Sequence, residues 1–376
     1  MNCPKVHRAR FSAGNSARFS SRLGRLPISA PLRRLSRACH PALRNVAPGR
    51  ALVATRDDAA QGAALMNQMD QHYDELMARC DPLPALPTAV VHPVQATVFE
   101  AVNDAAAAGL IAPVLIGPAA RIAAALTETG QSPDAYPVID TEHSHAAADK
   151  AAELAATGQV RAIMKGSLHS DELLGAIISP AAGLRTERRI SHAFVMLTND
   201  YPRPFIITDA AVNVQPDLLE KADIAQNAIG LWHALFGPQK PHLAILAAVE
   251  TVHPRMPATI DAAALCKMSD RGQITGALLD GPLAFDNAIS VRAAQEKGIE
   301  SVVAGRADIL LVPDIEAGNI LAKQLIFMGH AEGAGIVLGA RVPVILTSRA
   351  DSVRARLLSC ALAVLLADAR DRGQVK

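Results

Sequence analysis

From about Tyr73 to the C-terminus, short apolar runs alternate with longer stretches of helical spacing. Thr88–His92, Ala112–Gly117 and Val160–Lys165 have the length and composition of buried strands. The helical stretches stop at residues that suit a left-handed cap, such as Gly109. The alternation predicts right-handed βαβ crossovers, and hence an α/β fold built on parallel strands.

The same pattern continues beyond a polar interruption at Ser179–Ser191. The other predicted strands are Tyr136–Asp140, His192–Leu197, Pro204–Thr208, His242–Val249, Thr275–Asp280, Ala307–Val312, Ala334–Gly339 and Val342–Thr347. Half of the residues are apolar but only 3% are aromatic, a composition that suits helices packed on parallel strands. We predict two α/β domains with a central cleft, residues 73–190 with 337–376 and residues 191–336. Ligands of such sheets bind beyond the carboxyl ends of the strands.

The first residues differ sharply from the rest in charge. Residues 1–56 hold eleven Arg, one Lys and no acid, so the remaining chain has 25 basic and 36 acidic side chains. We interpret residues 1–65 as a disordered basic extension, either a transit-like segment or the result of a start assigned too early, with Met66 or Met69 as the true start. The acidic body argues against nucleic acid as a partner.

Neither a membrane span nor a disulfide framework is predicted. There is no uninterrupted apolar stretch of transmembrane length. The five cysteines are scattered and form no C-x-x-C pair, which is typical of free thiols in a reducing compartment such as the cytoplasm.

One candidate loop, Lys165–Asp171 (KGSLHSD), joins a predicted strand to a helix. Gly166 allows close backbone approach to a ligand, and Ser170 is placed to cap the helix. Free backbone N–H groups at the helix start, with Lys165, Ser167 and His169, can receive a phosphate. An ordinary capped βα loop is the alternative.

A second loop, Thr347–Ser352 (TSRADS), has the same position relative to a strand and a helix. Ser348 offers a hydroxyl donor, and the Arg349 guanidinium can bind phosphate through two hydrogen bonds. Asp351 is a candidate base or, alternatively, a plain helix cap.

Two further groups of polar residues follow predicted strands. Asp280 and Asp286 bracket a Gly-Pro pair, and Glu316–Asn319 (EAGN) follows the strand that ends at Val312. Metal binding or acid–base chemistry is conceivable for the carboxylates, but a turn and a capped helix start explain them as well. No Walker A loop, H-E-x-x-H or G-x-S-x-G motif occurs, and no metal site is predicted.

The order of these loops resembles the phosphate acetyltransferase/phosphate butyryltransferase family, from about Asp74 to the C-terminus. The segments that carry the resemblance are DGPLAFDNAI (Asp280–Ile289), ADILLVPDIEAGNILAKQL (Ala307–Leu325) and GIVLGARVPVILTSRADS (Gly335–Ser352). LRTERRISHAFVM (Leu184–Met196) and ITDAAVN (Ile207–Asn213) are similar to butyryltransferases and to the acetyltransferase part of fused enoyl-CoA hydratases.

The resemblance implies a homodimer of two α/β domains with an isocitrate/isopropylmalate dehydrogenase-like fold. It implies reversible transfer of a short acyl group, acetyl or butyryl, between CoA and inorganic phosphate, without a bound cofactor. Acyl-CoA, acyl phosphate and phosphate would be its substrates. The implied site residues are Ser348, Arg349 and Asp351 for catalysis; Lys165, Ser167, His169, Ser170 and Arg188 for phosphate and acyl binding; and Asp280, Asp286 and Asn319 for CoA.

Two positions depart from the pattern of the acetyltransferases. Where those enzymes have a proposed Asp base seven residues after the Ser, this chain has Ala355. Where they have an Arg in the helix after the first loop, it has Gly175. Arg185, Arg188 or Arg189 are candidates for the missing cation.

Other functions remain as alternatives at this stage. Domains of this family regulate some malic enzymes by binding acyl-CoA without turnover. A dehydrogenase of the isocitrate type and a fatty acyl-phosphate synthase are other enzymes on the same fold. The absence of a metal-binding Asp pattern and of a nucleotide loop argues against the dehydrogenase.

Overall fold

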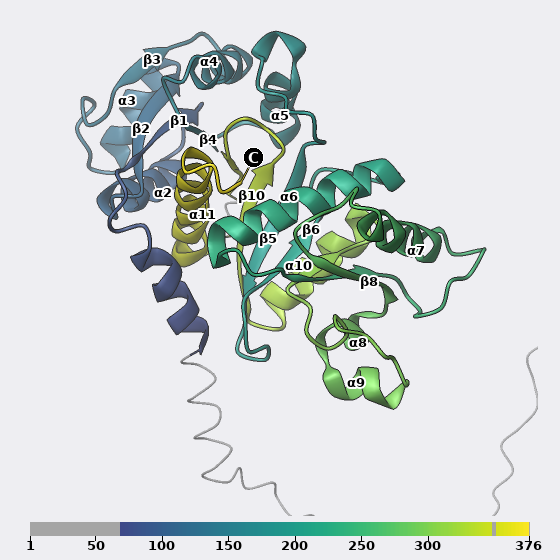
Figure 1. The fold of residues 1–376 in the computed structure, drawn as a ribbon. Coiled ribbons are helices and arrows are strands. Elements are labelled where there is room, and N and C mark those ends of the chain that lie inside the picture. The colour runs from purple at the N-terminus through teal and green to yellow at the C-terminus, as the bar shows by residue number, and fades with distance from the viewer. Residues whose placement is uncertain (1–67, 348–350, 376) are drawn as a thin grey trace, which may run out of the picture. The chain divides into compact units, whose positions relative to one another are not determined.

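An eleven-stranded sheet runs through residues 68–347 and 351–375, the part of the chain that the computed structural model describes (Figure 1). The strand order is β3-β2-β1-β4-β11-β10-β5-β6-β9-β7-β8. Each strand overlaps a range predicted from the apolar runs, so the α/β class and the large sheet are confirmed. A helical segment at residues 68–78 precedes the first strand.

One half of the sheet is parallel, as predicted. Its strands are β1 (Leu86–Val91), β2 (Ile111–Gly117), β3 (Val138–Asp140), β4 (Ala162–Lys165) and β11 (Val344–Ile345). The helices that follow them in the chain are α2 (Ala96–Ala107), α3 (Ala119–Glu128), α4 (Ser144–Ala156), α5 (Ser170–Ile178) and α11 (Val353–Asp371).

The other half is mixed, which corrects the prediction of an all-parallel sheet. It contains β5 (Ser191–Leu197), β6 (Phe205–Thr208), β7 (His242–Leu246), β8 (Leu278–Leu283), β9 (Ile309–Leu311) and β10 (Glu332–Leu338). The pairs β10–β11, β10–β5 and β5–β6 are antiparallel. Only short connections, residues 198–204 and 339–343, join β5 to β6 and β10 to β11, and a parallel crossover needs a longer one.

The remaining helices belong to this second half. They are α6 (Leu218–Phe236), α7 (Pro257–Asp270), α8 (Phe285–Ile289), α9 (Val291–Glu296) and α10 (Ile315–Phe327). Asp217 caps α6, and its carboxylate and that of Glu220 form a capping box. Gly281 and Pro282 lie inside β8, where the sequence had predicted a turn after the strand.

Alternate strand residues point to opposite faces of the sheet and feed different cores. On one face, a continuous hydrophobic cluster contains Val90, Ala193 and Ile309 together with residues of α2, α6 and α11. On the other face there are two separate clusters. One packs β1 and β4 against α4 and α5, and the other packs β6 and β9 against the α8–α10 region.

The two clusters part between β10 and β5: Val337 of β10 belongs to the first, and Met196 of β5 belongs to the second. The predicted boundary between two domains falls in this region and stays a prediction. Among the described helices, none is both long enough and apolar enough to cross a bilayer.

Candidate active site

The loop after β4 is built by close packing against the end of β1. The Gly166 and Ser167 N–H groups donate to the carbonyl oxygens of Val91 and His92, both at 2.9 Å. A Cβ on Gly166 would lie 2.3 Å from the Val91 oxygen, so only glycine fits. The glycine therefore permits approach to the neighbouring strand, and this contact fixes where the following side chains point.

The start of α5 differs in one detail from the prediction. His169 is the N-cap residue and Ser170 is the first helical residue, so Ser170 does not cap the helix. Asp171 and Glu172 lie in the first turn, as expected. The Lys165 ammonium folds back over the loop and donates to the Leu168 carbonyl oxygen at 3.2 Å.

These loop residues line a cavity of about 570 Å³. Its lining residues come from four segments of the chain: Lys165, Ser167, Leu168, His169 and Ser170; His192 and Phe194; Ala211; and Leu346 and Thr347. The Ser167 hydroxyl oxygen is buried and has no hydrogen-bond partner among the described residues. A buried hydroxyl without a hydrogen-bond partner destabilises the fold. A bound oxyanion would accept a hydrogen bond from it and remove that cost.

A buried carboxylate, Asp209, holds the far wall of this cavity in place. It accepts hydrogen bonds from the backbone N–H groups of His192, Ala211, Val212 and Asn213 and from the Asn213 amide, at 2.7–3.3 Å. The Asp209 turn thus joins the start of β5 to the segment that brings Ala211 to the cavity.

The His192 ring is buried beside this carboxylate. Burial lowers the pKa of His192 to about 4, against the opposing effect of the Asp209 charge, so the imidazole is neutral near pH 7. The ring packs edge-on against Phe194, with 4.5 Å between centroids. A Cβ on Gly335 of β10 would lie 2.8 Å from His192 Nε2, so the neighbouring strand needs a glycine there.

The second predicted loop is described only at its two ends. Ser348 and Arg349 lie outside the described residues, while Thr347 lines the cavity and Asp351 is half-buried. The helix cap is Ser352, whose hydroxyl accepts from the Ala355 N–H at 3.0 Å, so Asp351 is not the cap. Ala355 is buried in the first turn of α11, and a carboxylate is missing there.

The arginines proposed to replace the cation that acetyltransferases have at the position of Gly175 lie near that residue. Arg185, Arg188 and Arg189 line a neighbouring cavity of about 470 Å³ together with Gly175. Its other lining residues are Asp171, Leu174, Ile178, Ile190, Val212 and Asn213, several of them apolar. The cavity follows the first along α5 and along the segments 190–194 and 211–213.

The three residues predicted to bind CoA do not line either of these cavities. Asp280 lies in β8 and accepts from the Gly281 N–H. Asp286 is exposed in α8, 3.9 Å from the Lys297 ammonium. Asn319 in α10 donates to the Ala210 carbonyl oxygen at 3.1 Å, next to the Asp209 turn. Their role in CoA binding stays a prediction.

Sequence reasoning missed His192, Phe194, Ala211 and Leu346. They look like ordinary members of apolar segments. The available signal was the run Asp209–Asn213 after a strand, because a carboxylate in such a position often organises a turn. Within the described ranges, no group of three His, Cys, Asp or Glu side chains is placed to hold a metal.

Comparison with known proteins shows the family of the chain. Residues 142–364, more than half of the chain, match the family described as phosphate acetyl/butaryl transferase. A phosphate acetyltransferase of Rickettsia felis is 55% identical over 293 residues, which are 78% of this chain and 84% of that protein. A phosphate butyryltransferase of Clostridium acetobutylicum is 42% identical over 270 residues, 72% of this chain and 89% of that protein.

A solved structure supports the fold. The crystal structure of a branched-chain phosphotransacylase from Enterococcus faecalis superposes with a TM-score of 0.66 at 27% identity, over 75% of this chain and 99% of that one. The chain belongs to the phosphate acetyl/butaryl transferase family.

Proposed function

We propose that this chain is a phosphate acyltransferase that moves a short acyl group reversibly between CoA and inorganic phosphate. The observation that carries the proposal is the cavity at the end of β4. There a lysine, a buried serine hydroxyl without a partner and the start of α5 lie beside Thr347. The Ser348–Arg349 pair comes next in the chain. Relatives of this chain are named for this activity with acetyl and butyryl groups.

The proposed reaction joins both substrates in one complex. The CoA thiol, with a pKa near 8.5 if it resembles cysteine, gives its proton to a base and attacks the carbonyl carbon of the acyl phosphate. The carbon–sulfur bond forms and the bond from the carbonyl carbon to the phosphate oxygen breaks. Inorganic phosphate leaves with the electron pair. Asp351 and His169 remain the two candidates for the base.

Each polar group at the cavity has a proposed part. Lys165, His169 and the N–H groups at the start of α5 hold the phosphoryl oxygens, because a helix N-terminus attracts anions. Ser348 and Arg349 stabilise the carbonyl and phosphoryl oxygens as charge develops; such a donor contributes about 100- to 1000-fold in rate. Arg188 and its neighbours at the second cavity supply the cation that Gly175 lacks, and this cavity receives part of CoA.

We also propose that the protein acts as a homodimer through α10. That helix buries only Gly318 and Ala322, and it leaves Ile320, Phe327 and Met328 about 70% exposed. Large apolar side chains in such a row are costly in water, and a second copy of the chain would cover them. We also propose a cytoplasmic location for the protein. For its fold, we propose two domains arranged as in isocitrate/isopropylmalate dehydrogenases.

The test is consumption of the CoA thiol in the presence of acyl phosphate, and formation of acyl phosphate from acyl-CoA and phosphate. Rates with acetyl, propionyl and butyryl substrates define the chain length. The wild type is expected to turn over, and Lys165→Met is expected to raise the KM for phosphate at least tenfold. Tight acetyl-CoA binding without turnover would contradict the proposal and indicate a regulatory acyl-CoA sensor instead.

A further inference from the structure

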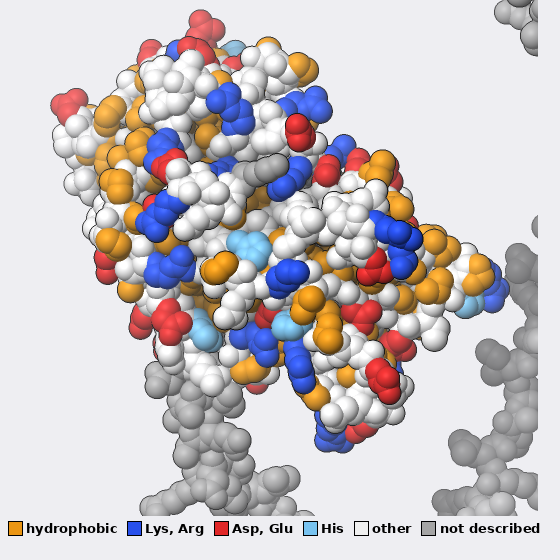
Figure 2. Space-filling model, in the orientation of Figure 1, with side chains coloured by type: hydrophobic (Ala, Val, Ile, Leu, Met, Phe, Trp, Pro, Cys, Tyr) orange, Lys and Arg blue, Asp and Glu red, His pale blue; other side chains and the backbone are white. Residues whose placement is uncertain are grey.

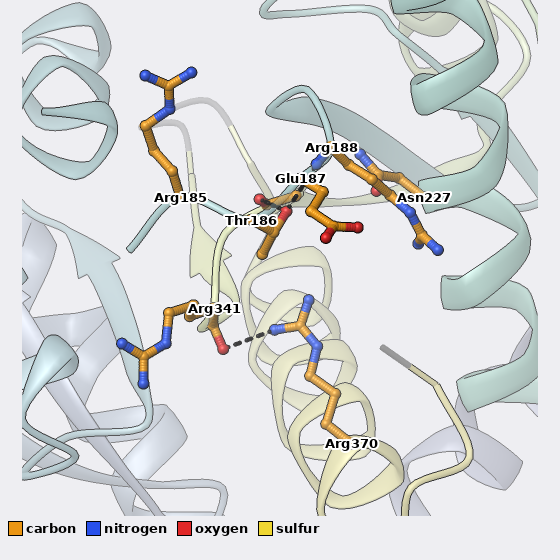
Figure 3. A pocket seen from close by; sticks show the side chains of 8 residues that line it. Arg185, Thr186, Glu187, Arg188, Asn227, Arg341 and Arg370 are labelled. Atoms are coloured by element: carbon orange, nitrogen blue, oxygen red, sulfur yellow. Dashed lines mark hydrogen bonds between the residues drawn. The ribbon is translucent and has the colours of Figure 1, made fainter. Parts of the chain in front are cut away.

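A third cavity, of about 400 Å³, lies on the other side of segment 185–189, between α6 and the C-terminal end of α11 (Figure 3). Its lining residues are Arg185, Thr186, Glu187, Arg188, Asn227, Gly339, Arg341 and Arg370. None of them is a large apolar or aromatic residue. Arg185 and Arg188 also line the cavity beside Gly175, whereas Asn227, Arg341 and Arg370 line this one and not that one.

Positive charge is in clear excess at this cavity. Four of its eight lining residues are arginines, and Glu187 is the one acid among them. Figure 2 shows several blue Lys and Arg side chains on the upper half of the face that is drawn, with red Asp and Glu side chains between some of them. An anion approaching the cavity is therefore attracted before it makes any contact.

Arg370 is a half-buried cation with few partners. Its Nη1 donates to the Arg341 carbonyl oxygen at 3.2 Å, while its Nε is buried without a hydrogen-bond partner. No described carboxylate forms an ion pair with it. Burial, and then repulsion from Arg188, lower the pKa of Arg370 to about 10. A buried cation without a carboxylate destabilises the fold, and a bound anion would offset that cost.

The side chains do not all point inward. In Figure 3 the Arg370 guanidinium and the Glu187 carboxylate reach into the middle of the cavity, whereas Arg185 and Arg341 point away from it. Arg188 runs along the wall toward Asn227 on α6. The recognition groups of this cavity are therefore Arg370 and Arg188, and Arg188 is shared with the cavity beside Gly175. Exposed Glu187 occupies the position that a ligand would take.

We propose that this cavity is a second anion site, which binds a compact multivalent oxyanion through Arg370 and Arg188 and displaces Glu187. The polar lining has no apolar surface on which a nucleobase or an acyl chain could pack. The ligand is therefore a small phosphate ester or a polycarboxylate. Arginine suits both, because its planar fork of donors matches phosphate and carboxylate oxygens.

A ligand bound at this site would affect the position of the first residues of β5. Asn227, which lines this cavity, donates to the Arg189 carbonyl oxygen at 2.8 Å and to the Ser191 hydroxyl at 2.9 Å. The next residue, His192, lines the reaction cavity.

Thermal unfolding and titration calorimetry with inorganic pyrophosphate and with citrate test the proposal. At ten times its dissociation constant, the tighter probe is expected to raise the wild-type Tm by about 3 °C. Arg370→Met should lose this rise without a lower Tm in probe-free buffer, because an unpaired, half-buried charge has been removed. Glu187→Gln should bind the probe at least threefold more tightly, and Arg341→Gln, whose side chain points away, should match the wild type.

Two further variants separate this site from the reaction cavity. Lys165→Met should keep the rise in Tm that the probe gives. If Lys165→Met loses it while Arg370→Met retains it, the anion binds in the reaction cavity and the proposal is wrong. It is also wrong if Glu187→Gln leaves the affinity unchanged. These measurements record binding and not turnover. Their outcome is therefore independent of whether the proposed acyl transfer is correct.

Discussion

Replacement of Asp209 by Asn tests whether one buried carboxylate assembles the far wall of the reaction cavity. The side chain keeps its size but loses its charge and one acceptor oxygen. The Asp209 carboxylate accepts five hydrogen bonds, two at Oδ1 and three at Oδ2. An amide nitrogen in either position would face N–H donors instead of accepting from them.

The magnitude follows from that count. At least two N–H donors lose their acceptor, and a hydrogen bond to a charged group contributes about 1.5–3 kcal/mol. We therefore expect Asp209→Asn to lower the free energy of unfolding by about 3–6 kcal/mol. In a chain of this size that corresponds to a fall in Tm of about 6–12 °C. The turn that holds Ala211 and His192 would loosen, so the KM for phosphate should rise as well.

Urea unfolding followed by circular dichroism measures the loss, and initial rates measure the KM. Asp270→Asn is the matched control, because its side chain is 63% exposed and pairs only with Lys267 on the same helix. Such an exposed pair contributes little to stability, because solvent screens it. If the two variants lose the same stability, the carboxylate does not organise the wall and the reasoning is refuted.

Three other predictions follow from single contacts. Gly166→Ala should destabilise the fold and lower turnover at least tenfold, because its Cβ would lie 2.3 Å from the Val91 oxygen; Gly175→Ala, with open space around it, should not. Since His192 has a folded pKa of about 4, below its unfolded value, the stability that its neutral form contributes is complete above about pH 6.5 and is lost as the pH falls toward 4. His192→Gln should flatten that part of the curve of urea midpoint against pH. Burial raises the pKa of Cys80 and Cys360 to about 12 and that of Cys266 to about 11, so peptide mapping should find these three thiols unmodified by iodoacetamide at pH 8 until the protein unfolds.

The sequence predicted the elements better than their pairing. Apolar runs located every strand, because burial on both faces leaves a strong compositional signal. Their directions in the middle of the sheet depend on connection length, and residues 198–204 and 339–343 are too few for a parallel crossover. The start of α6 depends in the same way on more than the apolar pattern, because the side-chain bonds of Asp217 and Glu220 decide where the helix begins.

The candidate site shows the same limit. The loop Lys165–Asp171 was recognisable because its residue types are unusual after a strand. His192 and Phe194 were not, because their place at the cavity depends on β5 lying where two cores part. The role of Asp209 depends on a turn that returns to the start of the neighbouring strand, a contact across 17 residues that no local pattern contains.

The proposed acyl transfer is tested most directly by Arg349→Ala, measured as phosphate-dependent turnover of acyl-CoA beside the wild type. Arg292→Ala is the matched control, since its side chain is 88% exposed and pairs only with Glu296. We predict that turnover falls at least 100-fold in Arg349→Ala, as for loss of a donor to developing charge, while Arg292→Ala keeps the wild-type rate. A rate near that of the wild type in Arg349→Ala would contradict the proposed mechanism.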